Sequence, residues 1–158
     1  MILFRETQRF RQPWLWLVLI CSALATLLPL IVSFAEKNAP GQAAMLGPGL
    51  LVLFLIGANF TGFYITKLET VITSDGVYFK WSPFFKTYRF YSLQEIQGMK
   101  IGVYNKPRFG LHKDPDFGRV HIVNGSNGIS FKAGQVQRVF IGTRRVAAMR
   151  HVLEHHFK

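Results

Sequence analysis

Cysteine and acidic residues are both scarce in this chain of 158 residues, and each scarcity excludes a class of site. Cys21 is the single cysteine, so no disulfide framework, CxxC motif or cysteine-based zinc site can form. Asp and Glu number 8 against 19 Lys and Arg, which gives a formal net charge of +11. The only closely spaced carboxylates, Asp114 and Asp116, lie in a segment typical of a solvated turn. No nucleophile elbow or glycine-rich phosphate loop is present, so we expect a non-enzyme without catalytic residues or cofactors.

Charge is absent from two long stretches in the N-terminal part of the chain. Residues 14–34 read WLWLVLICSALATLLPLIVSF, and residues 46–65 read LGPGLLVLFLIGANFTGFYI. Each has about the 20 residues that a helix needs to cross a hydrocarbon core roughly 30 Å thick. We therefore predict two transmembrane helices, with Pro29 bending the first. Signal cleavage after Ala25 fits poorly, because the apolar run continues well beyond that residue.

The distribution of cations predicts how these helices are oriented. Three arginines precede the first span, whereas the connection at residues 35–45 contains one lysine and one glutamate. The chain beyond residue 65 has 15 Lys and Arg against 6 Asp and Glu. Because Lys and Arg accumulate on the cytoplasmic side, both termini are expected there. The predicted organisation is a basic N-terminal segment with two transmembrane helices (1–65), followed by a cytoplasmic domain (66–158).

The domain at residues 66–158 has the pattern of a mainly-β fold. Asp75-Gly76 separates two alternating runs, residues 66–73 and 77–82, and this predicts a β-hairpin. Further strands are expected at 86–91, 98–104, 119–123, 129–132 and 136–141. A last amphipathic helix, capped by Thr143, has an apolar stripe. The stripe consists of Val146, Met149, Leu153 and Phe157. We expect about seven antiparallel strands in a small barrel or sandwich, closed by this C-terminal α-helix.

Three stretches of this domain have a familiar form: KLETVITSDGVYFKWSPF, YSLQEIQGMKI and VQRVFIGTRRVAAMRHVL. With the order of elements, they resemble the bacterial pleckstrin-homology-like (PH-like) membrane proteins, in which one or two spans precede a PH-like domain. The resemblance implies a multi-pass protein of the bacterial inner (cytoplasmic) membrane. Its motifs, such as Ile141-Gly142-Thr143 before the last helix, are structural. The resemblance therefore implies a fold more firmly than a function.

A long exposed loop is predicted at residues 105–118, NKPRFGLHKDPDFG, because it contains two prolines, two glycines and several charges. Loops of this length within a compact domain are often functional. We expect the chain to be a non-enzymatic membrane-anchored binding or scaffold module that contacts a protein partner here or at an exposed strand edge. The expected partner-binding residues are Lys106, Arg108, Phe109, His112, Lys113 and Phe117. An alternative is a small accessory subunit of a larger membrane complex, with the spans as the interface.

A second alternative, a sensor of the anionic lipid surface, comes from the aromatic and basic stretch at residues 78–96. Here a hairpin tip would dip into the inner leaflet. The expected lipid-surface residues are Lys80, Trp81, Phe84, Phe85, Lys86 and Arg89. The spacing of their cations departs from the head-group motif of PH domains, so any contact is expected to be non-specific. Strand alternation should place at least half of the aromatic residues in the core.

The histidines and the net charge raise two further possibilities. His151 and His155 have the spacing of two zinc ligands on one helix face, but neither an HExxH motif nor a third ligand accompanies them. His112 and His121 are isolated and are interpreted as structural residues. We therefore expect no metal site. The net charge could attract a polyanion, but the basic flanks of the membrane spans already explain it, and no nucleic-acid partner is expected.

Overall fold

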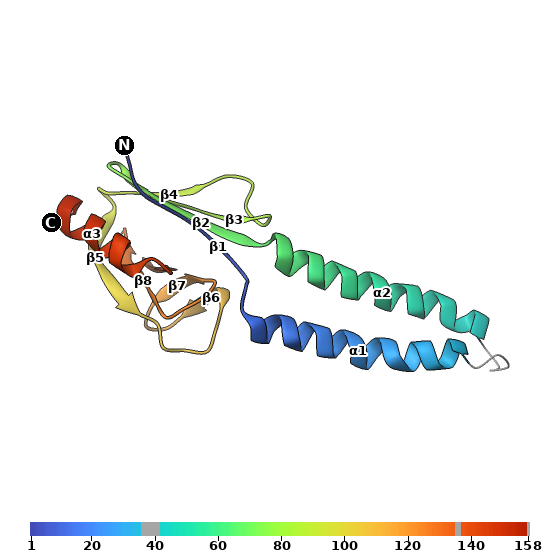
Figure 1. Cartoon of the computed structure of the whole chain (residues 1–158). Helices are drawn as coiled ribbons and strands as arrows, with labels where there is room; N and C mark the ends of the chain where they lie inside the picture. Colours follow the sequence, from blue (N-terminus) through green and yellow to red (C-terminus); the bar gives the residue numbers. More distant parts are fainter. Residues whose placement is uncertain (36–41, 135–136, 158) are drawn as a thin grey trace. The chain divides into compact units, whose positions relative to one another are not determined.

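The computed structural model describes residues 1–35, 42–134 and 137–157, without the side chains of residues 42–46 (Figure 1). The chain forms two compact units. One is Arg11–Ile65, and the other combines Met1–Phe10 with Thr66–Lys158. The expected domain boundary at residue 66 therefore leaves out an N-terminal segment, which belongs to the β domain.

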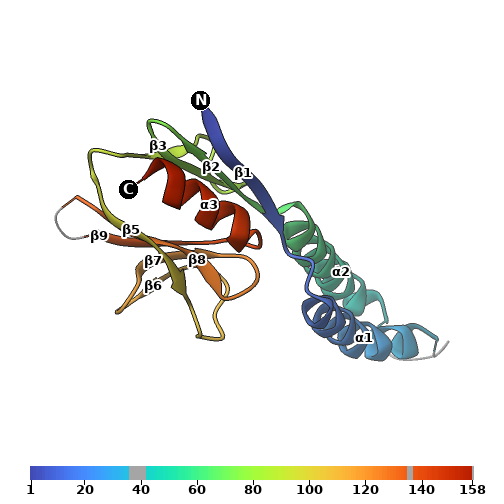
Figure 2. The ribbon, with the colours of Figure 1, turned by 60° about the vertical axis from the view of Figure 1, so that its left-hand side comes forward.

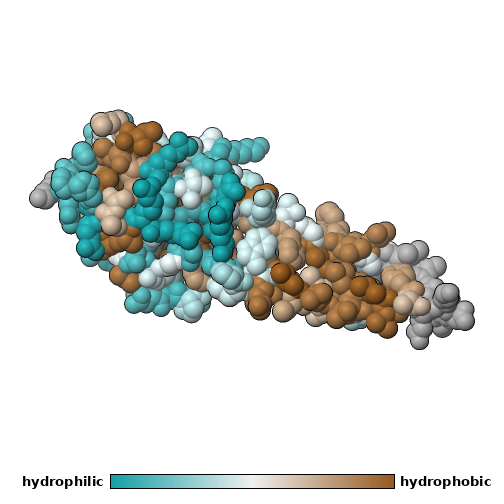
Figure 3. Space-filling view, in the orientation of Figure 1, coloured by the Kyte–Doolittle hydropathy of each residue, from teal (hydrophilic) through white to brown (hydrophobic). Residues whose placement is uncertain are grey.

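The first unit contains two apolar helices, α1 (Pro13–Ala35) and α2 (Gln42–Ile65). Both are long and apolar enough to cross a membrane, as predicted. Figure 3 shows hydrophobic residues over the helices and mostly hydrophilic residues over the β domain. The connection expected at 35–45 includes residues 36–41, which lie outside the described residues, and α2 begins within its last part.

One antiparallel sheet has the order β1-β2-β3-β4. Its strands are β1 (Ile2–Arg9), β2 (Lys67–Thr73), β3 (Gly76–Ser82) and β4 (Arg89–Ser92). The Asp-Gly hairpin between β2 and β3 is confirmed. The fourth strand is shorter than expected, because residues 83–88 form the turn that follows the cis Ser82–Pro83 peptide.

Strand β1 was not predicted, and it brings the N-terminal segment into contact with the C-terminal part of the chain. Phe4, Glu6 and Gln8 alternate toward the interior of the domain. The Glu6 carboxylate is 7% exposed, and it accepts hydrogen bonds from Thr143 Oγ1 at 2.5 Å and from the Arg144 N–H at 2.9 Å. The N-terminal strand is therefore fastened to the segment that leads into the last helix.

Replacing Glu6 with alanine should lower the free energy of unfolding of the β domain by about 1–3 kcal/mol, because a buried hydroxyl loses its acceptor. Urea unfolding of the full-length protein in detergent micelles, followed by pulse proteolysis, would measure the change. Glu154→Ala, at an exposed position of the last helix, is the control and should change stability little. Equal unfolding midpoints for the two variants would contradict this role of Glu6.

The second sheet has the order β5-β8-β9-β7-β6. Its strands are β5 (Ile96–Val103), β6 (Gly110–Asp114), β7 (Gly118–Ile122), β8 (Asn127–Ala133) and β9 (Gln137–Gly142). The pair β7–β9 is parallel, and the other pairs are antiparallel. Of the expected barrel or sandwich, the closed barrel is wrong, because no strand of the first sheet pairs with a strand of the second in the described residues. The expected antiparallel pattern is wrong for β7 and β9.

The two sheets and the last helix, α3 (Val146–His156), share one core. Figure 2 shows α3 at the opening between the sheets, beside β1 and β5. Met149, Val152 and Leu153 are the buried residues of the helix. The helix has no side-chain N-cap; the Thr143 hydroxyl instead accepts from the Arg145 N–H at 3.0 Å. A smaller cluster lies outside this core and consists of Tyr104, Val120, Ile122 and Phe140, with Phe117 packed against it.

Candidate functional site

The predicted loop at 105–118 contains a strand, because residues 110–114 form β6 and pair with β7. The remaining loop is fastened to this hairpin by Lys106. Its ammonium group lies 2.7 Å from Asp114 Oδ2 and 2.9 Å from Asp116 Oδ2. The hydrogen bond from Lys106, with backbone hydrogen bonds from Asp116 and Phe117, lowers the pKa of Asp114 to about 2. Lys106 therefore has internal partners and is not a free cation for a ligand.

Two more of the predicted partner-binding residues, His112 and Phe117, contact the smaller cluster around Tyr104. The Tyr104 hydroxyl lies 2.7 Å from His112 Nε2, and burial lowers the pKa of His112. Phe117 packs edge-on against Tyr104 and Phe140, with ring centroids 5.3 and 5.4 Å apart. The other three predicted residues, Arg108, Phe109 and Lys113, are exposed.

The predicted lipid-surface residues also divide into buried and exposed positions. Trp81 is 2% exposed, and Phe85 packs against the main core. The Arg89 guanidinium lies over the Phe85 ring, 4.3 Å from its centroid. Phe84 is 71% exposed, and Lys86, two residues later in the sequence, is also exposed. Of the two adjacent phenylalanines, only Phe84 therefore faces outward. Lys80 lies on β3 with its ammonium 5.6 Å from the centroid of the Tyr88 ring.

A buried hydrogen bond between Trp81 and His121 fixes the protonation of this histidine. The Trp81 Nε1–H donates to His121 Nδ1 over 2.9 Å. Because an indole N–H can only donate, Nδ1 must be unprotonated, and the proton of the neutral imidazole lies on Nε2. Burial lowers the pKa of His121 to about 3, with smaller contributions from Arg89 and Arg119. No hydrogen-bond partner for Nε2 is found among the described residues. His121 is therefore a neutral donor with its N–H unused.

His121 lines a pocket that takes residues from both sheets. The volume of this intersheet pocket is about 350 Å³. Phe85 and Arg89 come from the β3–β4 turn and β4, and the other lining residues come from β6 and β7. Those residues are Leu111, His112, Lys113, Arg119 and His121. The structure thus brings together members of the two predicted groups, which are separate in the sequence.

The electrostatics of the intersheet pocket favour an anion. Arg89, Lys113 and Arg119 line it, and no acidic residue does. Within the described part of the chain, none of these three cations has an ion pair. Guanidinium and ammonium groups form short, charge-assisted hydrogen bonds to carboxylates and phosphates. Phe85 and Leu111 form an apolar part of the lining, so the pocket suits an acidic group on a carbon chain.

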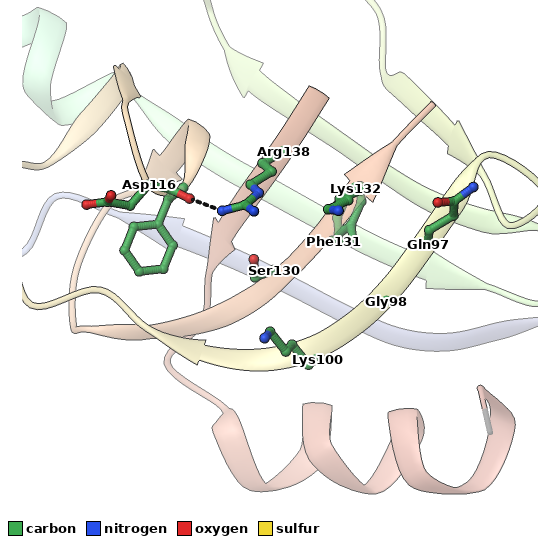
Figure 4. Close-up of a pocket in the computed structure, with 9 residues that line it drawn as sticks. Gln97, Gly98, Lys100, Asp116, Ser130, Phe131, Lys132 and Arg138 are labelled. Carbon is green, nitrogen blue, oxygen red and sulfur yellow. Dashed lines mark hydrogen bonds between the residues drawn. The ribbon is translucent and has the colours of Figure 1, made fainter. Parts of the chain in front are cut away.

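Two further hollows lie on the five-stranded sheet. The larger, of about 530 Å³, is on the outer face, away from α3 (Figure 4). It is lined by Gln97, Gly98, Lys100, Asp116, Phe117, Ser130, Phe131, Lys132 and Arg138. In Figure 4 the Arg138 side chain reaches toward the β6–β7 turn, where its Nη1 donates to the Asp116 carbonyl over 2.9 Å. The smaller, of about 350 Å³, lies at this turn and is lined by Lys113, Asp114, Gly118, Arg119, Gln137 and Arg138.

Sequence reasoning missed Arg119, His121 and Arg138 as site residues. These residues lie in runs that have the alternating pattern of ordinary strands, so spacing alone provides no signal for a site. Only the parallel pairing of β7 with β9 brings Arg119 beside the start of β9. Comparison with known proteins gives no match to a protein family, a curated protein or a solved structure.

Proposed function

We propose that this chain is a membrane-anchored, non-enzymatic binding protein, in which two spans hold a PH-like domain at the cytoplasmic face of a bacterial inner membrane. The intersheet pocket is the observation that supports binding most directly. It offers three cations without ion pairs in the described residues. Its lining contains no carboxylate and no thiol. This set of groups can hold an acidic ligand.

The pairing of β1 with β2 supports the two-span arrangement. Strand β1 precedes α1, and β2 follows α2. Two strands of one sheet must lie on the same side of a membrane, and two crossings return a chain to the side from which it started. The excess of Lys and Arg in residues 66–158 favours the cytoplasmic side.

The PH-like assignment is supported by the order of the elements. Two β-sheets are followed by one C-terminal helix, and its buried residues enter the core between the sheets. The Ile141-Gly142-Thr143 segment leads from β9 toward that helix, as the family resemblance implies. The parallel pair β7–β9 departs from the expected antiparallel pattern.

The ligand proposed for the intersheet pocket is an acidic side chain of a protein partner. Leu111 is 53% exposed beside the pocket on β6, an edge strand of the five-stranded sheet. An edge strand can pair with an extended segment of another chain, and such pairing would bring acidic side chains of the partner to Arg119 and Lys113.

Photo-crosslinking in native membranes tests this function. With benzoylphenylalanine at Leu111 of the full-length protein, we expect a discrete protein adduct. The adduct should fall at least fivefold in the double variant Arg89→Gln, Arg119→Gln, because the pocket loses two cations. The same reagent at Ala147, an exposed position of α3, is the control and should not give that adduct. Adducts that do not change in the double variant, or the absence of any protein adduct, would contradict the proposal.

One observation favours a second function, contact with anionic lipid. Phe84 is 71% exposed, and Lys86 close to it is also exposed. An aromatic ring beside a cation is a combination that lies favourably at a membrane surface. The crosslinking experiment is repeated with benzoylphenylalanine at Phe84. If this variant and the Leu111 variant both form adducts with lipid and none with protein, this function is favoured over a protein partner.

A further inference from the structure

The three hollows described above adjoin one another, because each shares lining residues with the next, and we call their combined surface the track. The intersheet pocket and the hollow at the β6–β7 turn share Lys113 and Arg119. The hollow at the turn and the hollow of Figure 4 share Arg138. The track therefore runs from the space between the sheets, past the β6–β7 turn, to the outer face of the five-stranded sheet.

Cations line this track along its whole length. They are Arg89, Lys113, Arg119, Arg138, Lys132 and Lys100. Gln97, Lys132 and Arg138 are cross-strand partners on β5, β8 and β9, and neighbouring strands of a sheet lie about 4.8 Å apart. Figure 4 shows Lys132 and Arg138 side by side, with Lys100 on the neighbouring part of β5.

The two acidic residues on the track pair with Lys106, which lies outside the track and balances one of their two negative charges. Asp114 and Asp116 both bind Lys106, at 2.7 and 2.9 Å. Among the described residues, no ion pair involves any of the six cations that line the track. Six cations against the one carboxylate charge that Lys106 leaves unbalanced create a strongly positive potential, which a single small anion cannot neutralise.

We propose that this cationic track binds an extended acidic segment of the protein partner, rich in Asp or Glu. The proposal rests on the proposed binding function and names the chemistry of the partner. One acidic side chain enters the intersheet pocket, where Arg89 and Arg119 provide donors. Further acidic side chains lie against Lys113 and Arg138 at the turn, and against Lys132 and Lys100 on the outer face.

The geometry favours a protein segment over a nucleic acid. Single strands bind through aromatic rings on which their bases stack. The aromatic residues of the track are already in contact with protein: Phe85 lies under Arg89, Phe117 packs against Tyr104 and Phe140, and Phe131 is 2% exposed. No ring of the track is therefore open for stacking in the described residues.

The geometry also disfavours a membrane surface as the ligand. The intersheet pocket opens between the two sheets, whereas the hollow of Figure 4 is on the opposite face of the five-stranded sheet. A planar layer of head groups cannot reach both ends of such a track. A flexible, extended peptide can follow the bend at the β6–β7 turn.

Peptide binding to the full-length protein in nanodiscs of zwitterionic lipid tests the proposal. The probe is a fluorescein-labelled twelve-residue peptide of alternating Glu and Ser, and the control peptide has Gln in place of Glu. We expect fluorescence anisotropy to give at least tenfold tighter binding of the Glu peptide. The affinity should also fall as salt rises, because the cations are at the surface.

Three double variants locate the binding site. Arg89→Gln with Arg119→Gln removes cations from the pocket end, and Lys100→Gln with Lys132→Gln removes exposed cations from the outer face. Each pair should weaken binding of the Glu peptide five- to twentyfold. Arg144→Gln with Arg150→Gln removes the same charge from exposed positions at α3 and should change affinity less than twofold.

The outcomes that overturn the proposal are distinct from failure of the proposed function. If only the pocket-end variant weakens binding, the ligand is a single acidic group; the extended track is then wrong, and the proposed function stands. If the α3 control weakens binding as much as the track variants, the attraction is non-specific. Tighter binding of a twelve-nucleotide oligothymidine than of the Glu peptide would replace a protein partner with a nucleic acid. A pocket-dependent crosslink at Leu111 without any peptide binding would also refute the acidic track.

Discussion

Replacing Trp81 with alanine should lower the free energy of unfolding of the β domain by about 3–5 kcal/mol. The ring is 2% exposed within the main core, and its Nε1–H provides the hydrogen bond to His121 Nδ1. The substitution leaves a large cavity and removes a buried hydrogen bond at the same time. Pulse proteolysis of the full-length protein in urea and detergent micelles would measure the change.

Phe84→Ala is the matched control for this prediction, because it also removes an aromatic ring from the same stretch of sequence. Phe84 is 71% exposed, and its replacement should change the free energy of unfolding by less than about 0.5 kcal/mol. If the two variants unfolded at the same urea concentration, Trp81 would not have the core position described above.

Lowering the pH from 7 to 5 should destabilise the β domain by about 2 kcal/mol through His121. Burial lowers the pKa of His121 from its ordinary value of 6.5 to about 3. The unfolded chain therefore binds more protons than the folded domain between these two values. The contribution of His121 to the free energy of unfolding is fully present above pH 6.5, and it is lost progressively as the pH falls toward 3. Urea unfolding at a series of pH values would give the slope of the free energy of unfolding against pH.

His121→Gln should remove most of this pH dependence, because glutamine can accept the Trp81 hydrogen bond and does not titrate. His156→Gln, on the exposed end of α3, should keep the full slope. The pKa of His112 is also lowered and contributes in the same direction, so a smaller slope remains. Asp114, with a pKa of about 2, loses its contribution only below about pH 4, outside this window. An unchanged slope in His121→Gln would refute the assignment.

The elements that could be predicted are those with a strong local pattern. Both apolar helices, the Asp-Gly hairpin and the C-terminal helix with Met149 and Leu153 on its buried face are found in the structure. Strand β1 was missed because two of its inward residues, Glu6 and Gln8, are polar, so the segment was interpreted as a basic flank of the first span. Strand β6 was missed because prolines and glycines surround it.

The topology and the site depend on pairing that no local pattern contains. The position of the β8–β9 hairpin between β5 and β7, and the parallel contact of β7 with β9, are tertiary features. Several pocket residues were predicted, among them Phe85, Arg89 and Lys113, but in two separate hypotheses. The residues that join those two groups, Arg119 and His121, lie in a strand whose neighbours could not be inferred from the sequence.

The bond between Glu6 and Thr143 affects the order in which the domain can form during synthesis. These two residues are 137 positions apart, and both apolar helices lie between them in the chain. The ribosome therefore releases β1 first and the two apolar helices next, and it completes Thr143, the partner of Glu6, only near the end of translation. Contacts between such distant residues form slowly, because the ends of a long loop must first meet. For most of its synthesis, the first strand of the domain has no completed sheet to join.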